Sequence, residues 1–318
     1  IDELRLLTGT AHDKKINILS NADYSKAKPE RQYHSDKIAV VYASGQIYDG
    51  EGDDTKIGGT TLSQAIREAR NDKKVKAIVM RVNSPGGSAL ASENIWREIA
   101  LAKKAGKIVV TSMGDYAASG GYYISCNSDY IFAQPNTLTG SIGVFGMVPS
   151  IQKALQSKLG ITIDGVKSND HADFLTGFKA MDPTELNVMQ QNVEQTYGLF
   201  VKRVSDGRKM SMAAVDSIGQ GRVWAGKDAI AIGLVDKLGS IDDAIAKAAQ
   251  LAKVSNYKLV YYPQQKSFFE KLFAPKEDEV EMMMKAKLGD LYYMYKGLNQ
   301  VLSQEGVQAR MPMEMTIQ

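Results

Sequence analysis

The chain has 318 residues, of which 44% are hydrophobic and 24% are charged, and its formal net charge is +3. These values are typical of a globular protein that buries a full core as one large domain, alone or with appendages. The 39 basic and 36 acidic residues form no basic stripe between aromatic residues, so the sequence argues against nucleic acid as a partner. Cys126 is the only cysteine, which excludes an internal disulfide and a multi-cysteine metal site.

The three histidines lie far apart and lack carboxylates at metal-ligand spacing, so we expect no metal and no cofactor. No apolar run approaches the roughly 20 residues that span a bilayer, and the chain begins with Ile1 and without a signal-peptide pattern. We interpret residues 1–36 as the tail of an upstream segment followed by a linker.

Apolar runs and amphipathic segments alternate between residues 37 and 262. Strand, helix, strand series with continuous apolar strands are typical of an α/β fold in which outer helices cover a parallel sheet. The expected strands are 37–43, 76–82, 107–112, 130–133, 137–144, 161–166 and 257–262; the expected helices begin near residues 60, 88, 153, 182 and 241; and the expected loops are 46–59 and 167–182.

The last segment, 263–318, is rich in Met and aromatic residues at helical spacing. Such stripes are adaptable surfaces, so we predict a helical C-terminal extension. Packing on the core is the favoured interpretation, ahead of an oligomer contact, a membrane contact or a surface for apolar substrate.

Ser119 lies among small residues, 117–121, between a buried strand and the start of a helix. Alanine and glycine neighbours let another backbone approach its hydroxyl, as a nucleophile requires. The alternative is a serine that only caps the helix, and these residues alone do not decide between the two.

A second turn, Pro85-Gly86-Gly87, follows the strand at 76–82. Two glycines permit backbone conformations that expose N–H groups, which suits an oxyanion hole, although a plain strand-to-helix turn has the same composition. A third segment, 137–144, alternates polar and apolar residues, and Ser141 within it can face the same site.

A serine nucleophile needs a general base within hydrogen-bonding reach. The local candidates are Lys167, His171 and Lys179, all in the polar loop 167–182. A solvated surface position is the favoured interpretation of each.

Together the segments 81–87, 113–122 and 138–144 resemble those of the signal peptide peptidase A family, and the resemblance covers roughly residues 37–262. It implies a β-α spiral like that of Clp protease and the crotonases. It also implies that Ser119 is the nucleophile of a serine-lysine dyad and that Ser141 orients the lysine. The oxyanion hole would be formed by N–H groups of Gly86 or Gly87 and of Gly120.

The sequence departs from the family at the lysine. The single-repeat branch carries it in a loop of pattern KSGxxKD, whereas Ala172 stands at that position here. In the tandem-repeat branch, whose C-terminal half this chain resembles, the first repeat supplies the lysine. We therefore predict that the chain alone is a poorly active half of a peptidase and that Lys167 does not substitute.

The resemblance further implies a serine endopeptidase that degrades cleaved signal peptides at the periplasmic face of the bacterial inner membrane. An absent N-terminal anchor and assembly into a homo-oligomer, often a tetramer, belong to the same expectation. Two alternatives stay open: a crotonase-like enzyme acting on an acyl-thioester, and a scaffold that binds apolar peptides without cutting them.

Overall fold

The computed structural model describes residue 5, residues 36–53 and 55–263, residue 287 and residues 306–310. The chain divides into two units, Ile1–His34 and Ser35–Gln318, and the second unit contains both sheets and all the candidate site residues. Most of the upstream tail expected at 1–36 and of the helical extension expected at 263–318 lies outside the described residues. No helix in the described part is both long and apolar enough to cross a bilayer.

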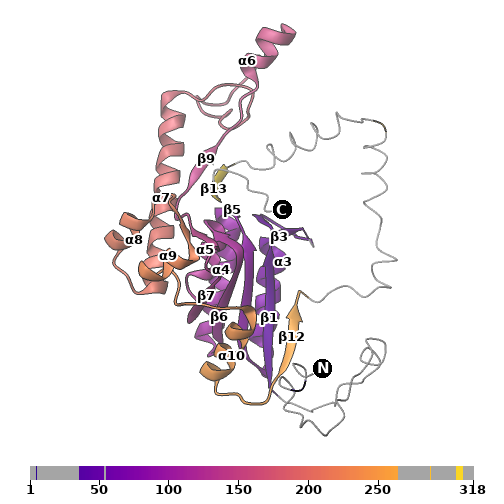
Figure 1. Cartoon of the computed structure of the whole chain (residues 1–318). Helices are drawn as coiled ribbons and strands as arrows, with labels where there is room; N and C mark the ends of the chain where they lie inside the picture. The colour runs from indigo at the N-terminus through magenta and orange to yellow at the C-terminus, as the bar shows by residue number, and fades with distance from the viewer. Residues whose placement is uncertain (1–4, 6–35, 54, 264–286, 288–305, 311–318) are drawn as a thin grey trace. The chain divides into compact units, whose positions relative to one another are not determined.

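A mainly parallel sheet forms the centre of the second unit. Its strands follow the order β10-β8-β6-β4-β1-β12, and the β10–β8 pair is antiparallel. Off this path, β7 pairs with β6, and β11 pairs with β7. Figure 1 shows β12 beside β1, although the two strands are far apart in the chain. The strands are β1 (Lys37–Ser44), β4 (Val75–Ser84), β6 (Ile108–Ala118), β7 (Tyr130–Ala133), β8 (Leu138–Gly140), β10 (Val223–Ala225), β11 (Lys237–Leu238) and β12 (Lys258–Tyr262).

Helices cover both faces of this sheet because successive residues of each strand point to opposite sides. On one face Val41 and its neighbours pack with apolar residues of α3 and α4, and on the other Val40 packs with Ala244 and Ala248 of α10. The predicted α/β class with a parallel sheet and outer helices is confirmed. The helices packed on or near the sheet are α3 (Gly59–Asn71), α4 (Ala89–Lys104), α5 (Gly120–Ser125), α8 (Met212–Ile218), α9 (Gly226–Ala231) and α10 (Ile241–Ala252).

A second, smaller sheet has the order β3-β2-β5-β13-β9. Its member β13 comes from the far C-terminal part of the chain and runs antiparallel to both neighbours. In Figure 1 the yellow strand β13 lies next to β9. The strands are β2 (Gln46–Tyr48), β3 (Lys56–Gly58), β5 (Gly86–Ser88), β9 (Phe145–Met147) and β13 (Gly306–Arg310).

An arm formed by residues 148–182 and the start of α7 (Pro183–Arg208) extends away from the sheet in Figure 1. It includes α6 (Gln152–Ala154) and the π-helix Leu155–Leu159, in agreement with the helix expected near 153. Asp182 and Glu185 form a capping box at the start of α7, where the sequence places the helix start. The arm exposes many large apolar side chains, among them Leu159, Ile163, Val166, Leu175 and Phe178.

Several expected elements differ from the structure. The segment 161–166 is exposed and is not a strand, because its apolar alternation has no partner strand to pair with. The loop expected at 46–59 contains β2 and β3, and the strand expected at 137–144 is confined to β8. The third expected strand continues six residues further, to Ala118, since the ends of β4 and β8 pair with it there. Within the extension expected to be helical, residues 306–310 form β13.

Candidate active site

Ser119 joins β6 to α5, and its backbone has a conformation that residues other than glycine rarely adopt. Its φ of 54° and ψ of −117° lie outside the regions favoured by residues other than glycine. Its N–H donates to Gly140 O at 2.8 Å, and its carbonyl accepts from Tyr123 N at 2.8 Å. Such strain costs on the order of 1–3 kcal/mol and clusters at functional sites. The backbone therefore supports the nucleophile interpretation over that of a simple cap, since the Ser119 side chain makes no capping hydrogen bond.

The glycine turn lies beside Ser119 because β4 and β6 are parallel partners. Ser84, before the turn, pairs with Ala117, and a Cβ on Gly121 would lie 2.5 Å from Ser84 O. Gly86 and Gly87 have φ values of 100° and 155°. Gly86 N donates to Ser84 Oγ at 3.2 Å, a partner for an oxyanion-hole candidate that sequence reasoning did not identify. The sequence signal that could have identified Ser84 is its position directly before Pro85.

Ser141 is brought to the same place by the pairing of Ala118 with Gly140. Like Ser119 it is buried and has a positive φ, 47°. Its N–H donates to Arg222 O at 2.8 Å, and its hydroxyl lies 3.4 Å from Gly221 O. The structure thus brings together the five residues expected at the site, Ser119, Ser141, Gly86, Gly87 and Gly120, while their catalytic roles stay predictions.

No described lysine or histidine hydrogen-bonds to the Ser119 hydroxyl, whose protein partner is Gly143 O at 3.4 Å. Each local candidate base is engaged in the arm instead. Lys167 Nζ lies 3.6 Å from Asp173 Oδ1 and donates to Asp170 O. Among the described residues, the Ser119 hydroxyl therefore has no hydrogen bond to a group that could act as its base.

Lys179 belongs to a charged cluster at the start of α7. Its ammonium lies 2.9 Å from both Asp173 and Glu185, and these hydrogen bonds raise the pKa of Lys179 well above its usual value. The same ammonium lowers the pKa of Asp173 and of Glu185. A lysine held protonated in this way cannot accept a proton from serine near neutral pH.

The same cluster includes three groups that can bind a cation. Ligand atoms of His171, Asp182 and Glu185 lie within 4.8 Å of one another, an arrangement that the sequence analysis missed because residue 171 lies 11 and 14 positions before them. The Lys179 ammonium already contacts Glu185 Oε1, the oxygen to which His171 Nδ1 is closest, at 3.4 Å. We therefore assign no metal role to the cluster.

A partly buried ion pair supports the helix that begins after Ser119. Tyr123, one turn along α5, donates from its hydroxyl to Glu93 Oε2 at 2.6 Å, and Arg203 of α7 forms a forked pair with the same carboxylate. The Arg203 guanidinium lies 3.8 Å above the Trp96 ring. These contacts tie α4, which follows the glycine turn, to α5 and α7, so they fix the two halves of the site relative to each other.

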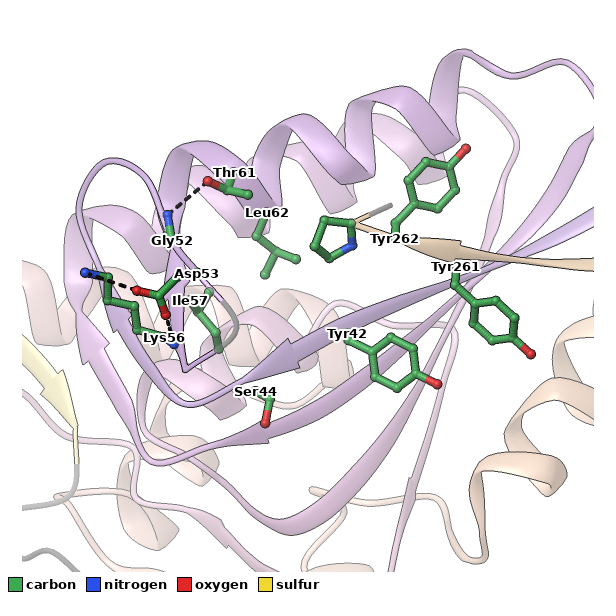
Figure 2. A pocket seen from close by; sticks show the side chains of 12 residues that line it. Tyr42, Ser44, Gly52, Asp53, Lys56, Ile57, Thr61, Leu62, Tyr261 and Tyr262 are labelled. Carbon is green, nitrogen blue, oxygen red and sulfur yellow. Dashed lines mark hydrogen bonds and ion pairs between the residues drawn. The ribbon is translucent and has the colours of Figure 1, made fainter. Parts of the chain in front are cut away.

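A cavity of about 740 Å³ opens at the carboxyl ends of β1 and β12. Figure 2 shows the stacked rings of Tyr42 and Tyr261 on one side and the paired Asp53 and Lys56 on the other. Neither Ser119 nor the glycine turn lines it. The cavity is therefore distinct from the candidate active site.

The part of the chain that contains Ser119 and Ser141 is also similar to known proteins. The profile of Peptidase family S49 matches residues 101–255, which include Ser119 and Ser141. A Methanocaldococcus jannaschii protein catalogued as a candidate protease is 36% identical over 237 residues, covering 72% of this chain and 75% of that protein. The chain belongs to peptidase family S49.

Some of the relatives are considerably longer than this chain. Protease 4 of Salmonella typhi is 46% identical over 272 residues, which are 86% of this chain but 43% of that protein. The chain therefore spans less than half of this relative. A solved membrane-bound stomatin-specific protease with a bound substrate peptide covers 75% of this chain and 96% of its own at 17% identity, with a TM-score of 0.46.

The glycine turn gives a first test through stability. A Cβ on Gly87 would lie 1.9 Å from Ile47 O of β2, so Gly87→Ala must push β2 and β5 apart. We expect it to lower the free energy of unfolding by about 3 kcal/mol, measured in urea. Gly106 also has a positive φ but nothing within 4 Å of its added Cβ, so Gly106→Ala should cost only about 1 kcal/mol of backbone strain. Equal losses would contradict the close approach.

The ion pair of Glu93 with Arg203, to which Tyr123 donates, gives a second test. Tyr123→Phe removes a hydroxyl that donates to a carboxylate and leaves its cavity otherwise filled. We expect a loss of about 2 kcal/mol in urea unfolding. Tyr261→Phe, at an exposed ring, should change stability by less than about 0.5 kcal/mol.

The charged cluster gives a pH test. Because Asp173 and Glu185 have lowered pKa values, their contribution to local stability is present above their ordinary values of 3.8 and 4.5 and is lost as pH falls through the values in the folded chain. The raised pKa of Lys179 adds a contribution that is lost only in strong alkali. We expect hydrogen-exchange protection factors in 171–185 to fall as the pH is lowered through this acid range. In Lys179→Met, protection should be lower at neutral pH and less dependent on pH.

Proposed function

We propose that this chain carries the nucleophile half of a serine endopeptidase. The observation that supports this best is Ser119, strained and buried between the glycine turn and the Ser141 segment in a family S49 chain. The missing part is the base, and we assign it to a lysine of an upstream repeat of the same protein. The limited coverage of Protease 4 by this chain is in keeping with such a repeat.

In this mechanism the Ser119 hydroxyl oxygen attacks the carbonyl carbon of a peptide bond while its proton passes to the lysine amine. Ser141 would orient that amine. N–H groups of Gly86 or Gly87 and of Gly120 would stabilise the oxyanion, whose charge develops on the former carbonyl oxygen. The carbon–nitrogen bond then breaks, the departing amine takes up the proton, and water hydrolyses the acyl-enzyme.

The substrates we propose are apolar peptides such as cleaved signal peptides, at the periplasmic face of the bacterial inner membrane. The names of the relatives support a protease, and the apolar side chains exposed on the arm are suited to an assembly of several copies. We accordingly propose a homo-oligomer, a tetramer by family resemblance, held at the membrane through an upstream anchor.

The decisive test compares hydrolysis of a fluorogenic apolar peptide by this chain alone and by the chain with its upstream half restored. We expect activity in the restored protein and a loss of at least about 1,000-fold in Ser119→Ala, because the nucleophile and base act as a unit. Ser125→Ala removes another buried hydroxyl of α5 and should leave the activity within a fewfold of the parent.

Activity of the chain alone that depends on Ser119 would overturn the assignment of the base to the upstream repeat. Restored protein that hydrolyses no peptide, and is not labelled at Ser119 by a fluorophosphonate, would overturn the peptidase itself.

A further inference from the structure

Strand β6 changes its partner along its length. One edge of β6 pairs with β4. The other edge pairs first with β7, through residues 110–112, and then with β8, through residues 116–118. The strand β8 leads to Ser141, and this end of β6 leads to Ser119. The change of partner is therefore what brings the two serines together.

A bulge in β6 accompanies the change of partner. On β4 one residue, Asn83, separates two paired positions, whereas on β6 three residues, 114–116, separate the two partners. Extra residues in one strand lose their places in the ladder and bend the strand. Backbone groups of the bulge must therefore find other hydrogen-bond partners.

Asn83 bonds to the bulge from the side of β4. Its Oδ1 accepts a hydrogen bond from Tyr116 N at 3.2 Å, and its Nδ2 donates to Asp115 Oδ2 at 3.4 Å. A Cβ on Gly114 would lie 2.8 Å from the same Oδ1, so the amide fills the space that a side chain at residue 114 would need. The Asn83 amide thus takes the place of the strand pairing that the bulge removes.

Thr137 bonds to the bulge from the side of β8. Its hydroxyl donates to Gly114 O at 2.7 Å and accepts from Gln134 N at 2.9 Å. The residue has no exposed surface and stands directly before β8. Its hydroxyl therefore links the bulge to the strand that leads to Ser141.

The bent end of β6 determines where Ser119 lies. Two residues separate the bulge from Ser119, whose N–H donates to Gly140 O at 2.8 Å, directly before Ser141. A shift of the bulge would therefore move one serine relative to the other. Catalysis is sensitive to such a shift, because a misplacement of about 1 Å can cost roughly 100-fold in rate.

We propose that Asn83 and Thr137 are positioning residues, which hold the bend of β6 and thereby place Ser119 against Ser141. Neither side chain needs to touch the substrate. The claim that the bend matters for catalysis rests on the proposed function. The claim that the two side chains hold the bend stands on their hydrogen bonds and on strand pairing alone.

The test compares two variants of the bend with a matched control. Asn83→Ala and Thr137→Val remove the side-chain hydrogen bonds to the bulge. The control is Thr111→Val, because Thr111 is an equally buried threonine of β6 that lies before the bulge, with its hydroxyl 2.7 Å from Ser128 Oγ. We expect both threonine variants to lower the urea midpoint by similar amounts. Circular dichroism establishes folding, and if Thr137→Val does not fold, Asn83→Ala decides.

The first measurement is hydrogen exchange in this chain alone, which does not depend on catalysis. We expect Asn83→Ala and Thr137→Val to lower the protection factor of the Ser119 amide about fivefold more than Thr111→Val does, because the loss of a local contact eases local opening.

The second measurement is hydrolysis of the fluorogenic apolar peptide by the protein with its upstream half restored. We expect kcat to fall by roughly 10- to 100-fold in Asn83→Ala and Thr137→Val, with KM within about twofold, while Thr111→Val keeps kcat within about twofold. Asn83→Asp combined with Asp115→Asn retains an acceptor for Tyr116 N and a polar pair between residues 83 and 115. This exchange should recover kcat to within about threefold of the parent.

The proposal is overturned by variants of the bend that match Thr111→Val in both kcat and exchange. Altered exchange with an unchanged kcat would also overturn it, since the bend would then serve stability alone. If the parent hydrolyses no peptide but exchange changes as expected, the two side chains do hold the bend and the peptidase assignment fails. If the parent hydrolyses the peptide and the variants change neither exchange nor kcat, the peptidase assignment stands and the positioning role fails.

Discussion

The pairing of Ser84 with Ala117 at the ends of β4 and β6 is the contact on which the geometry of the site depends. Strands that run in the same direction end at the same edge of a sheet, so the residues that come after them meet there. The glycine turn follows β4, and Ser119 follows β6. The pairing of β8 with β6 adds Ser141 by the same rule. Three segments far apart in the chain are placed together by hydrogen bonds of the backbone.

Charge makes Lys179 unsuited to act as the general base. The described lysines of the 167–179 loop are paired with carboxylates, and Lys179 is held protonated by two of them. A general base near neutral pH needs the opposite environment, in which burial away from anions lowers the pKa of the amine. The arm also exposes apolar side chains that a monomer leaves in water. Both features are in keeping with the proposal that another part of the same protein completes the site.

Local patterns were sufficient to predict the central elements, whereas the set of site residues was predicted only with the family resemblance. Continuous apolar runs indicated the buried parallel strands, and Asp182-Pro183 indicated the start of α7, because both signals are local in sequence. Residues 161–166 show the limit of this reasoning: their alternation suits a strand, but a strand also needs a neighbouring edge, which sequence periodicity does not reveal. The pairing of β13 with β5 depends on residues more than 200 positions apart, and no local pattern predicts it. The ion pair of Glu93 with Arg203 was hidden for the same reason.

The conformation of Ser119 also bears on why a serine stands there at all. Glycine adopts a positive φ without the strain that a Cβ brings, and the neighbours of Ser119 are already small. Packing and backbone geometry would therefore tolerate glycine at this position and even favour it. The serine at this position therefore carries a backbone strain, on the order of 1–3 kcal/mol, that glycine would avoid. If the hydroxyl is the nucleophile that we propose, stability and activity favour different amino acids at residue 119.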